Sequence, residues 1–140
     1  MPAAWCEPLS FLQRITENVA HCQLLNKAAD PELSSDSLRR FEYVCAFAVS
    51  CISFNHNRLS KPFNPILGET YELSRFVSIE YLFLIKGTII YLIFISRDDM
   101  GFKIVCEQVS HHPPISAFHS ESSDNGNSWK FYGSINPKIK

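Results

Sequence analysis

The chain has 140 residues, of which 46% are hydrophobic and 19% charged, so it is long and apolar enough for one domain with a core and is unlike a disordered tail. The net charge of -1 at pH 7 provides no general attraction for nucleic acid, and no nucleic-acid partner is predicted. The 11 phenylalanines predict an aromatic-rich interior or a surface that meets lipid.

Cysteine usage and the first residues indicate the cellular setting. The five cysteines are an odd number, and none of them forms a CxxC pair. The opening sequence MPAAWCEPLS has neither the basic region nor the apolar region of a signal peptide. These features predict free thiols in a reducing, cytoplasmic environment.

Two helices are predicted in the first half of the chain. Ser10 and Gln13 fit a capping box, and apolar residues recur at helical spacing up to about Asn26. After a loop around Pro31, a second helix is predicted over residues 38–54. Its apolar face consists of Phe41, Val44, Cys45, Ala48, Cys51 and Ile52. Packing in the core is the favoured interpretation of both apolar faces, and a helix lying on a membrane is the alternative.

The second half of the chain predicts four strands, at residues 70–73, 101–109, 114–120 and 129–135. In the second of them, Phe102, Ile104 and Cys106 would share one face. Turn-forming residues at 124–126 join the last two strands as a hairpin. Helices followed by antiparallel strands define an α+β fold class.

Residues 76–96, FVSIEYLFLIKGTIIYLIFIS, are almost wholly apolar and are interrupted by Glu80 and Lys86. The segment is roughly long enough to span a bilayer, but each of these charges costs about 2.5–3.5 kcal/mol on insertion scales, which argues against a span. Its β-branched and aromatic content favours a hairpin that turns at residues 86–88. An inserted segment that the surrounding fold does not need is the third interpretation.

The sequence KPFNP places Lys61 and Asn64 each before a proline, which favours extended or polyproline backbone. With three residues per turn, the two side chains would point the same way, and Gly68 would let the chain turn away behind them. Such a pair of donors suits an anion, and a solvated loop lysine beside an Asx turn fits the spacing as well.

The sequence CEQVSHHPPIS sets His111 and His112 directly before two prolines. Neighbours in an extended segment point to opposite faces, so the histidines are not expected to chelate one metal together. A zinc site with Cys106 and His119 matches no standard spacing, and a nucleophilic Cys106 would lie across the strand from its histidine base. Ligand recognition remains, because imidazoles donate hydrogen bonds to phosphate oxygens and the prolines restrict the backbone. A pair of surface histidines is the alternative.

Several segments resemble a known family. EQVSHHPP, at 107–114, matches the fingerprint of the oxysterol-binding-protein family at all eight positions, and KPFNPILGETYEL, at 61–73, resembles a second family segment. FEYVCAFAVS, at 41–50, and FYGSINPKIK, at 131–140, are also similar to family segments. The chain thus resembles the N-terminal part of the ligand-binding domain of an oxysterol-binding-protein-related lipid-transfer protein.

The resemblance implies helices followed by a nearly closed antiparallel β-barrel around a hydrophobic lipid tunnel. It implies that a sterol or another lipid and phosphatidylinositol 4-phosphate are exchanged between membranes by a peripheral, cytoplasmic protein. No catalytic residue, metal or other cofactor is implied. The lipid headgroup is assigned by the resemblance to Lys61, Asn64, His111 and His112.

The family domain is more than twice as long as this chain, so residues 1–140 are expected to form part of one domain, with an incomplete barrel and impaired lipid transfer. Residues 76–96 fall where the family has a short connection, and they are interpreted as an apolar insertion from an unspliced segment. Two alternatives are a membrane-associated fragment anchored by residues 76–96 and a cysteine/histidine hydrolase.

Overall fold

The computed structural model describes residues 6–54, 60–75, 82–85, 88–91, 100–123 and 128–137. The helices are α1 (Phe11–Ile15), η2 (Thr16–Val19), α2 (Gln23–Ala28), η3 (Pro31–Leu33) and α3 (Ser37–Ser53). The strands are β1 (Cys6–Ser10), β2 (Lys61–Phe63), β3 (Thr70–Arg75), β4 (Leu82–Ile85), β5 (Thr88–Tyr91), β6 (Phe102–His111), β7 (Pro114–Ser122) and β8 (Lys130–Ile135).

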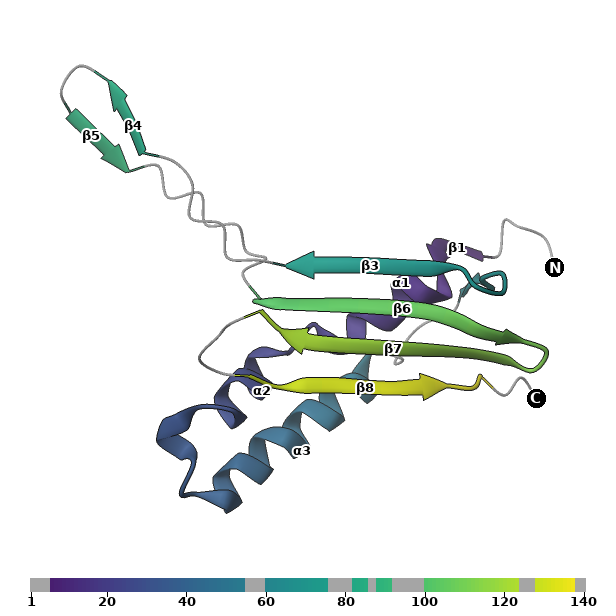
Figure 1. The fold of residues 1–140 in the computed structure, drawn as a ribbon, viewed down its shortest axis with the longest axis horizontal. Helices are drawn as coiled ribbons and strands as arrows, with labels where there is room; N and C mark the ends of the chain where they lie inside the picture. The colour runs from purple at the N-terminus through teal and green to yellow at the C-terminus, as the bar shows by residue number, and fades with distance from the viewer. Residues whose placement is uncertain are drawn as a thin grey trace.

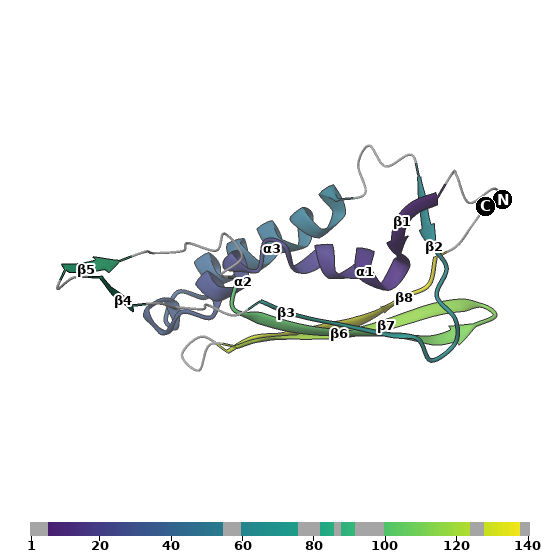
Figure 2. The ribbon, with the colours of Figure 1, turned by 90° about the horizontal axis from the view of Figure 1, so that it is seen from above.

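The chain folds into a sheet layer and a helix layer. Strands β3, β6, β7 and β8 form an antiparallel sheet in that order, and α1, α2 and α3 lie over one of its faces (Figures 1 and 2). Strands β1 and β2 pair in parallel on the same side of the sheet as the helices (Figure 2). Helices followed by antiparallel strands confirm the α+β class. Over the described residues the sheet is open, with β3 and β8 at its edges.

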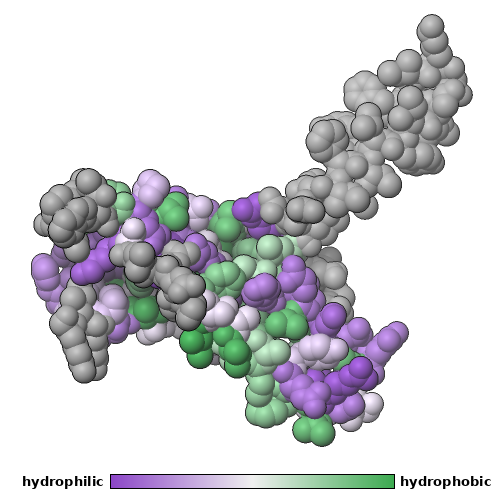
Figure 3. Space-filling model, turned by 180° about the vertical axis from the view of Figure 1, so that it is seen from behind, coloured by the Kyte–Doolittle hydropathy of each residue, from purple (hydrophilic) through white to green (hydrophobic). Residues whose placement is uncertain are grey.

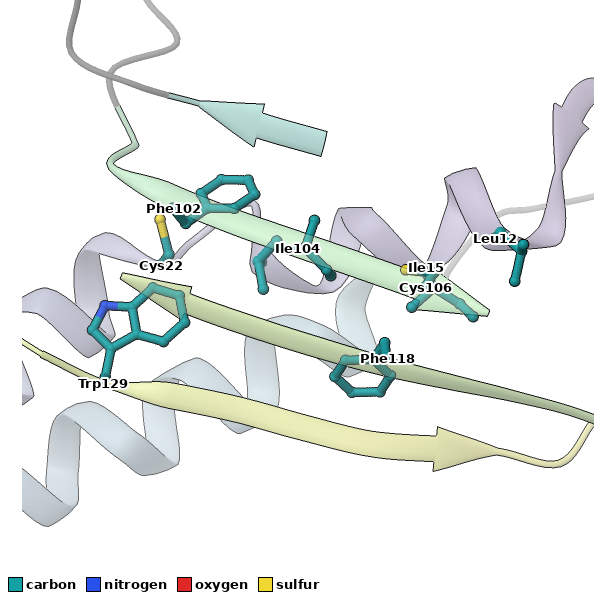
Figure 4. Close-up of a cluster of buried hydrophobic side chains, with 9 residues drawn as sticks. Leu12, Ile15, Cys22, Phe102, Ile104, Cys106, Phe118 and Trp129 are labelled. Carbon is teal, nitrogen blue, oxygen red and sulfur yellow. The ribbon is translucent and has the colours of Figure 1, made fainter. Parts of the chain in front are cut away.

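Strand β6 alternates as predicted. Phe102, Ile104 and Cys106 are at most 2% exposed, whereas Lys103 and Glu107 between them are exposed. Figure 4 shows the inward side chains in a cluster between the sheet and the helices. The other members of the cluster are Leu12, Ile15, Val19, Cys22, Phe118 and Trp129. Because both layers remove apolar surface from water at this cluster, it holds them together.

The segment predicted as one helix over residues 10–26 consists of three shorter helices, so the predicted continuity is wrong. Its start is as predicted: the N–H of Leu12 donates to Ser10 Oγ at 3.3 Å, and the N–H of Ser10 donates to Gln13 Oε1 at 2.8 Å. The helix changes to η2 at Thr16, whose hydroxyl donates to the Gln13 carbonyl at 2.6 Å. A hydroxyl bonded to a helical carbonyl competes with regular α-helical bonding, and a tighter turn follows.

The predicted apolar face of α3 is largely exposed. Phe41, Val44 and Ile52 expose 64%, 44% and 72% of their surface, and Cys45 and Ala48 are also exposed. Figure 3 shows hydrophobic residues among hydrophilic ones on the helix side of the molecule. The helix exists as predicted, but the prediction that this face packs in the core is wrong for the described part of the chain.

The strip of α3 that faces the rest of the molecule shares only Cys51 with the predicted apolar face. Phe47 is buried, and its ring lies 5.1 Å from that of Phe131 on β8. Arg40 Nε donates to a carbonyl in α2 at 3.0 Å, and the Cys51 thiol donates to a carbonyl in η2 at 3.2 Å. Spacings of seven and four residues place these three side chains on one helical face. The large apolar area of the phenylalanine therefore sets the rotation of the helix.

Part of the apolar segment 76–96 forms a hairpin, as one of its three interpretations predicts. Strands β4 and β5 pair antiparallel, with Leu82 opposite Tyr91 and Ile85 opposite Thr88, apart from the main sheet (Figure 1). The rest of the segment lies outside the described residues. Within the part of the chain that the structure describes, no helix combines the length and apolar character needed to cross a membrane.

Replacing Ile104, which is fully buried, by alanine tests the position of the core. We expect Ile104→Ala to lower the free energy of unfolding by about 2–5 kcal/mol, because the change leaves a cavity between the two layers. The matched control Ile52→Ala removes the same atoms from a side chain that is 72% exposed, and it should change the value by about 0.5 kcal/mol or less. Urea unfolding measures both, and equal losses would place the core elsewhere.

Candidate functional site

The histidine–proline sequence forms the turn of the β6–β7 hairpin. Strand β6 ends at His111, β7 begins at Pro114, and these two residues are cross-strand partners. His112 and Pro113 lie between them and are joined by a cis peptide bond. The Ser110 hydroxyl donates to the Pro113 carbonyl at 2.7 Å. The two prolines thus belong to a hydrogen-bonded hairpin tip, where the backbone has little freedom.

The two imidazoles contact one another. The ring centroids of His111 and His112 are 4.7 Å apart, and the rings meet edge to face at 70°. The expectation that they point to opposite faces of a strand is wrong, because only His111 is in the strand and His112 is in the turn, where the chain reverses. Both rings are therefore presented together at one end of the hairpin.

An extra residue interrupts the alternation of β6 before the histidines. Gln108 lies opposite Ser116, but Ser110 lies opposite Ile115, so Val109 has no partner of its own on β7. Such a β-bulge changes the direction in which the following side chains point.

The bulge decides the face of the sheet on which His111 lies. Cross-strand partners share a face, so His111 lies on the face of Pro114, which by alternation is also the face of Ser116 and Phe118. Ser116 and Phe118 are buried beneath the helix layer. His111 therefore turns toward the helix side, and its Nδ1 is buried with no hydrogen-bond partner among the described residues. A regular strand would have sent it to the other side.

The same bulge corrects the expectation for Cys106, which was predicted to lie across the strand from His111. Both residues lie on the helix-covered face. However, Cys106 is fully buried, and burial raises the pKa of its thiol to about 12. The thiolate is the nucleophilic form of cysteine, and at neutral pH this thiol is protonated, so the geometry gives no support to a cysteine hydrolase.

His119 lies on the opposite face from Cys106, because its cross-strand partner is Val105. Its ring stacks on Tyr132 with centroids 5.9 Å apart, and its Nε2 is 3.6 Å from a carboxylate oxygen of Glu121. A metal site that combines Cys106 and His119 would have to cross the sheet. Over the described ranges, no group of three or more metal-binding side chains comes together.

The donor segment KPFNP begins a parallel strand pair and is followed by a turn. Lys61 is the first residue of β2, which pairs with β1 rather than forming an isolated polyproline segment, and Asn64 follows β2; both residues are exposed. The predicted bend at Gly68 is confirmed by its φ of 78°. The N–H of Glu69 closes this turn on the Ile66 carbonyl at 3.1 Å. A left-handed residue at the third position of a turn favours glycine.

Two backbone hydrogen bonds fasten this turn to the strand that carries the histidines. The N–H of Gly68 donates to the Gln108 carbonyl at 2.9 Å, and the N–H of Gln108 donates to the Glu69 carbonyl at 3.0 Å. Figure 2 shows β2 and the tip of the β6–β7 hairpin at the same end of the molecule, with β2 on the helix side of the sheet. This is the side to which His111 turns.

Two residues that hold this end together were not singled out from the sequence. Glu69 accepts from the N–H of Ile66 at 3.0 Å and from the Ser10 hydroxyl at 3.2 Å, so it joins the turn to the start of α1. Gln108 accepts a hydrogen bond from the Ser116 hydroxyl, and both side chains are 1% exposed. The signal for Gln108 was a polar residue at the next inward position of an alternating strand. Glu69 had no comparable signal, because its partners lie in other segments.

A groove of about 640 Å³ lies between α2, α3 and β8. Its apolar lining includes Leu25, Val44, Phe47, Trp129 and Phe131, and its basic residues are Arg40 and Lys130. Neither the described histidines nor the predicted headgroup residues line it.

The imidazole pair and the loop that is hydrogen-bonded to the histidine-bearing strand lie at one end of a domain of the α+β class. The chain belongs to the oxysterol-binding protein family, whose sequence model matches residues 1–140.

The comparisons with individual proteins agree with this family. The chain is 46% identical over 140 residues to oxysterol-binding protein-related protein 1 of Homo sapiens, and it spans 12% of that protein. The structure is similar to the Osh1 ORD domain in complex with ergosterol, with a TM-score of 0.69 and 38% identity over 97% of this chain and 26% of that one. It is also similar to the Osh3 ORD in complex with PI(4)P from Saccharomyces cerevisiae, with a TM-score of 0.70 and 34% identity over 100% of this chain and 30% of that one.

Thiol reactivity tests the burial of the β6 face. Burial raises the pKa of Cys106 to about 12 and that of Cys22 to about 11, whereas Cys45 is exposed on α3. We expect iodoacetamide at pH 8 to alkylate Cys45 first, and Cys22 and Cys106 only after unfolding, as peptide mass spectrometry can measure. In the unfolded chain these thiols have the ordinary pKa of 9.0, whereas burial raises it in the folded chain. Above pH 9 the unfolded thiols lose their protons and the folded ones keep them, so the free energy of unfolding should be unaffected by these thiols below pH 9 and should decline above it. Equal labelling rates in the folded chain would contradict the buried face.

Proposed function

We propose that this chain supplies the headgroup-binding part of a lipid-transfer domain, in which Lys61, Asn64, His111 and His112 hold the phosphate of phosphatidylinositol 4-phosphate. The observation that carries the proposal is His111 Nδ1, which is buried without a partner among the described residues and lies beside the ring of His112. A buried polar atom without a hydrogen bond is costly, and a ligand that bonds to it would remove that cost.

The chemistry of the four side chains matches a phosphomonoester. Imidazole N–H groups, a lysine ammonium and an asparagine amide are all donors, and a phosphate offers several charged acceptor oxygens. Hydrogen bonds to charged groups contribute about 1.5–3 kcal/mol each. The donors come from two proline-containing segments that the hydrogen bonds at Gln108 fasten together, which reduces the entropy lost on binding.

The similar structures extend the proposal to the whole lipid. The Osh3 domain is described in complex with PI(4)P and the Osh1 domain in complex with ergosterol. We infer that the domain to which this chain contributes exchanges a sterol and phosphatidylinositol 4-phosphate at membrane surfaces. The exchange consists of binding and release, with no catalytic step and no cofactor, by a cytoplasmic protein that associates peripherally with the membrane.

The 140 residues by themselves are proposed to transfer lipid poorly. In the described part of the chain, β3 and β8 are edge strands, and each offers an unpaired row of backbone groups to water. A sterol needs an apolar site that encloses most of its surface. The donors for the headgroup are present in this chain, whereas an open sheet leaves the apolar part of a lipid exposed.

Phosphatidylinositol 4-phosphate with short acyl chains, added to the 140-residue chain, tests the headgroup assignment. We expect the imidazole NMR signals of His111 and His112 to shift with this lipid and not with phosphatidylinositol, which lacks the 4-phosphate. His111→Ala or His112→Ala should weaken binding about tenfold or more, because a charge-assisted hydrogen bond is lost. The matched control is His119→Ala, which removes an exposed imidazole from the opposite face and should leave the affinity unchanged.

The assignment fails if the signals of both histidines are unmoved, or if His119→Ala weakens binding as much as the other two changes. Extraction of dehydroergosterol from liposomes by the same chain measures the apolar part of the proposal. We expect little extraction even at concentrations at which the histidines respond, and stoichiometric extraction would contradict the impairment.

We also propose that residues 76–96 are an insertion within the single partial domain. Arg75 and Phe102 are cross-strand partners, so β3 and β6 are adjacent antiparallel strands. About two to five residues are enough to join such a pair. The long apolar connection is therefore not required by the pairing of the sheet.

Deleting residues 76–96 leaves residues 97–101 as the connection between the two strands. We expect the shortened chain to keep its urea midpoint and its histidine signals, because the paired residues are retained. Removing residues 97–101 as well is the control, since it also deletes Gly101, whose carbonyl accepts from the N–H of Ser123 at 2.8 Å, and it should destabilise the chain. Loss of the folded signals in the first variant would show that the segment is needed.

A further inference from the structure

Gln108 is a polar side chain on the apolar face of β6. It follows Phe102, Ile104 and Cys106 on the inward side and is as buried as they are, at 1% exposure. An amide in such a place is unfavourable unless its donors and acceptor are bonded. The hydrogen bonds of Gln108 therefore indicate what its burial achieves.

The side chain of Gln108 spans the bulge. Its Oε1 accepts from the Ser116 hydroxyl on β7, before the extra residue Val109. Its Nε2 donates to the carbonyl of Ser110 at 2.9 Å, after the extra residue. The two ends of one buried amide thus hold the two strands in the shifted register that turns His111 toward the helix side.

The backbone of Gln108 holds the second half of the candidate site. Its N–H donates to the Glu69 carbonyl, and its carbonyl accepts from the N–H of Gly68. The turn at these two residues follows directly on the segment that carries Lys61 and Asn64. One residue therefore bonds to both strands of the hairpin and to the turn that follows the donor segment.

We propose that Gln108 is a positioning residue for phosphate recognition, which holds the bulge in the form that places His111 beside the donor loop. The inference rests on the proposed function and deepens it, because it assigns the orientation of the imidazole to a residue that does not contact the ligand.

A buried serine elsewhere on β7 provides a matched comparison. Ser116 and Ser120 lie on the same face, are 1% and 0% exposed, and each donates a hydrogen bond to β6. Ser116 donates to the Gln108 side chain, whereas Ser120 donates to the Lys103 carbonyl at 3.0 Å, far along the strand from the histidines. Loss of either hydroxyl removes one buried hydrogen bond between β6 and β7, but only the bond of Ser116 is made to the residue beside the bulge.

Three variants of the 140-residue chain test the inference, namely Gln108→Met, Ser116→Ala and the control Ser120→Ala. The methionine keeps the length of the side chain and removes both of its hydrogen bonds. The first readout is the nuclear Overhauser effect between the rings of His111 and His112 without any lipid. The second is the affinity for short-chain phosphatidylinositol 4-phosphate, and the urea midpoint is recorded alongside.

We expect Gln108→Met to abolish the ring-to-ring effect. It should also weaken lipid binding about tenfold, because the His111 imidazole would no longer be aligned for a hydrogen bond to the charged phosphate. Ser116→Ala should change both readouts in the same direction and to a smaller extent. Ser120→Ala should lower the urea midpoint as much as Ser116→Ala and leave both readouts as in the unaltered chain. Ser116→Ala also keeps the inference testable if Gln108→Met does not fold.

Retention of the ring-to-ring effect in Gln108→Met and Ser116→Ala overturns the inference. Equal losses of the ring-to-ring effect and of lipid affinity in Ser116→Ala and Ser120→Ala overturn it as well, because they would show general loosening of the sheet. A chain that shows no response to the lipid refutes the proposed function, while the ligand-free ring contact still reports whether Gln108 positions His111.

Discussion

The extra residue at Val109 controls how the core and the candidate site relate to each other. Before it, β6 follows strict alternation and sends one apolar side chain after another into the cluster beneath the helices. After it, the alternation is shifted by one residue, so that His111 lies on the same side as the core. In a regular strand this histidine would face away from β2 and from the loop that carries Lys61 and Asn64. A bulge thus brings two segments that are distant in sequence to one side of the sheet.

This arrangement places apolar and polar features along a single face. The buried cluster and the groove between α2, α3 and β8 lie beneath the helix layer, and the imidazole pair lies at the end of the same face. Cys106 belongs to the apolar part, where burial keeps its thiol neutral.

Prediction from the sequence succeeded where the interactions were local. The capping box at Ser10 involves residues within one helical turn, and the bend at Gly68 depends on the backbone freedom of one residue. The alternation of β6 was correct as far as Gln108. The positions of the long helix and of the four strands of the main sheet were also recovered, because each has its own period of apolar residues, whereas β1 and β2 were not predicted as strands. The family was evident from the histidine–proline and lysine–asparagine segments.

Prediction failed where remote contacts decide between local alternatives. Helix α3 could have packed inward with its predicted apolar face or with the face that carries Phe47. The contact of Phe47 with Phe131, more than eighty positions away, selected the second face, although its sequence is less apolar. The first helix was interrupted at Thr16, where a hydroxyl competes for a carbonyl, although the apolar spacing continued.

The α+β class and the family could be established from the sequence, because periodicity, turn chemistry and short motifs depend on neighbours along the chain. The tertiary structure was needed to show that the two histidine rings meet and that His111 faces the helix side. It also decided that the donor loop is tied to the histidine-bearing strand at Gln108. These features depend on a one-residue shift of register, and the energy that selects such a shift comes from hydrogen bonds between segments that the linear sequence keeps apart.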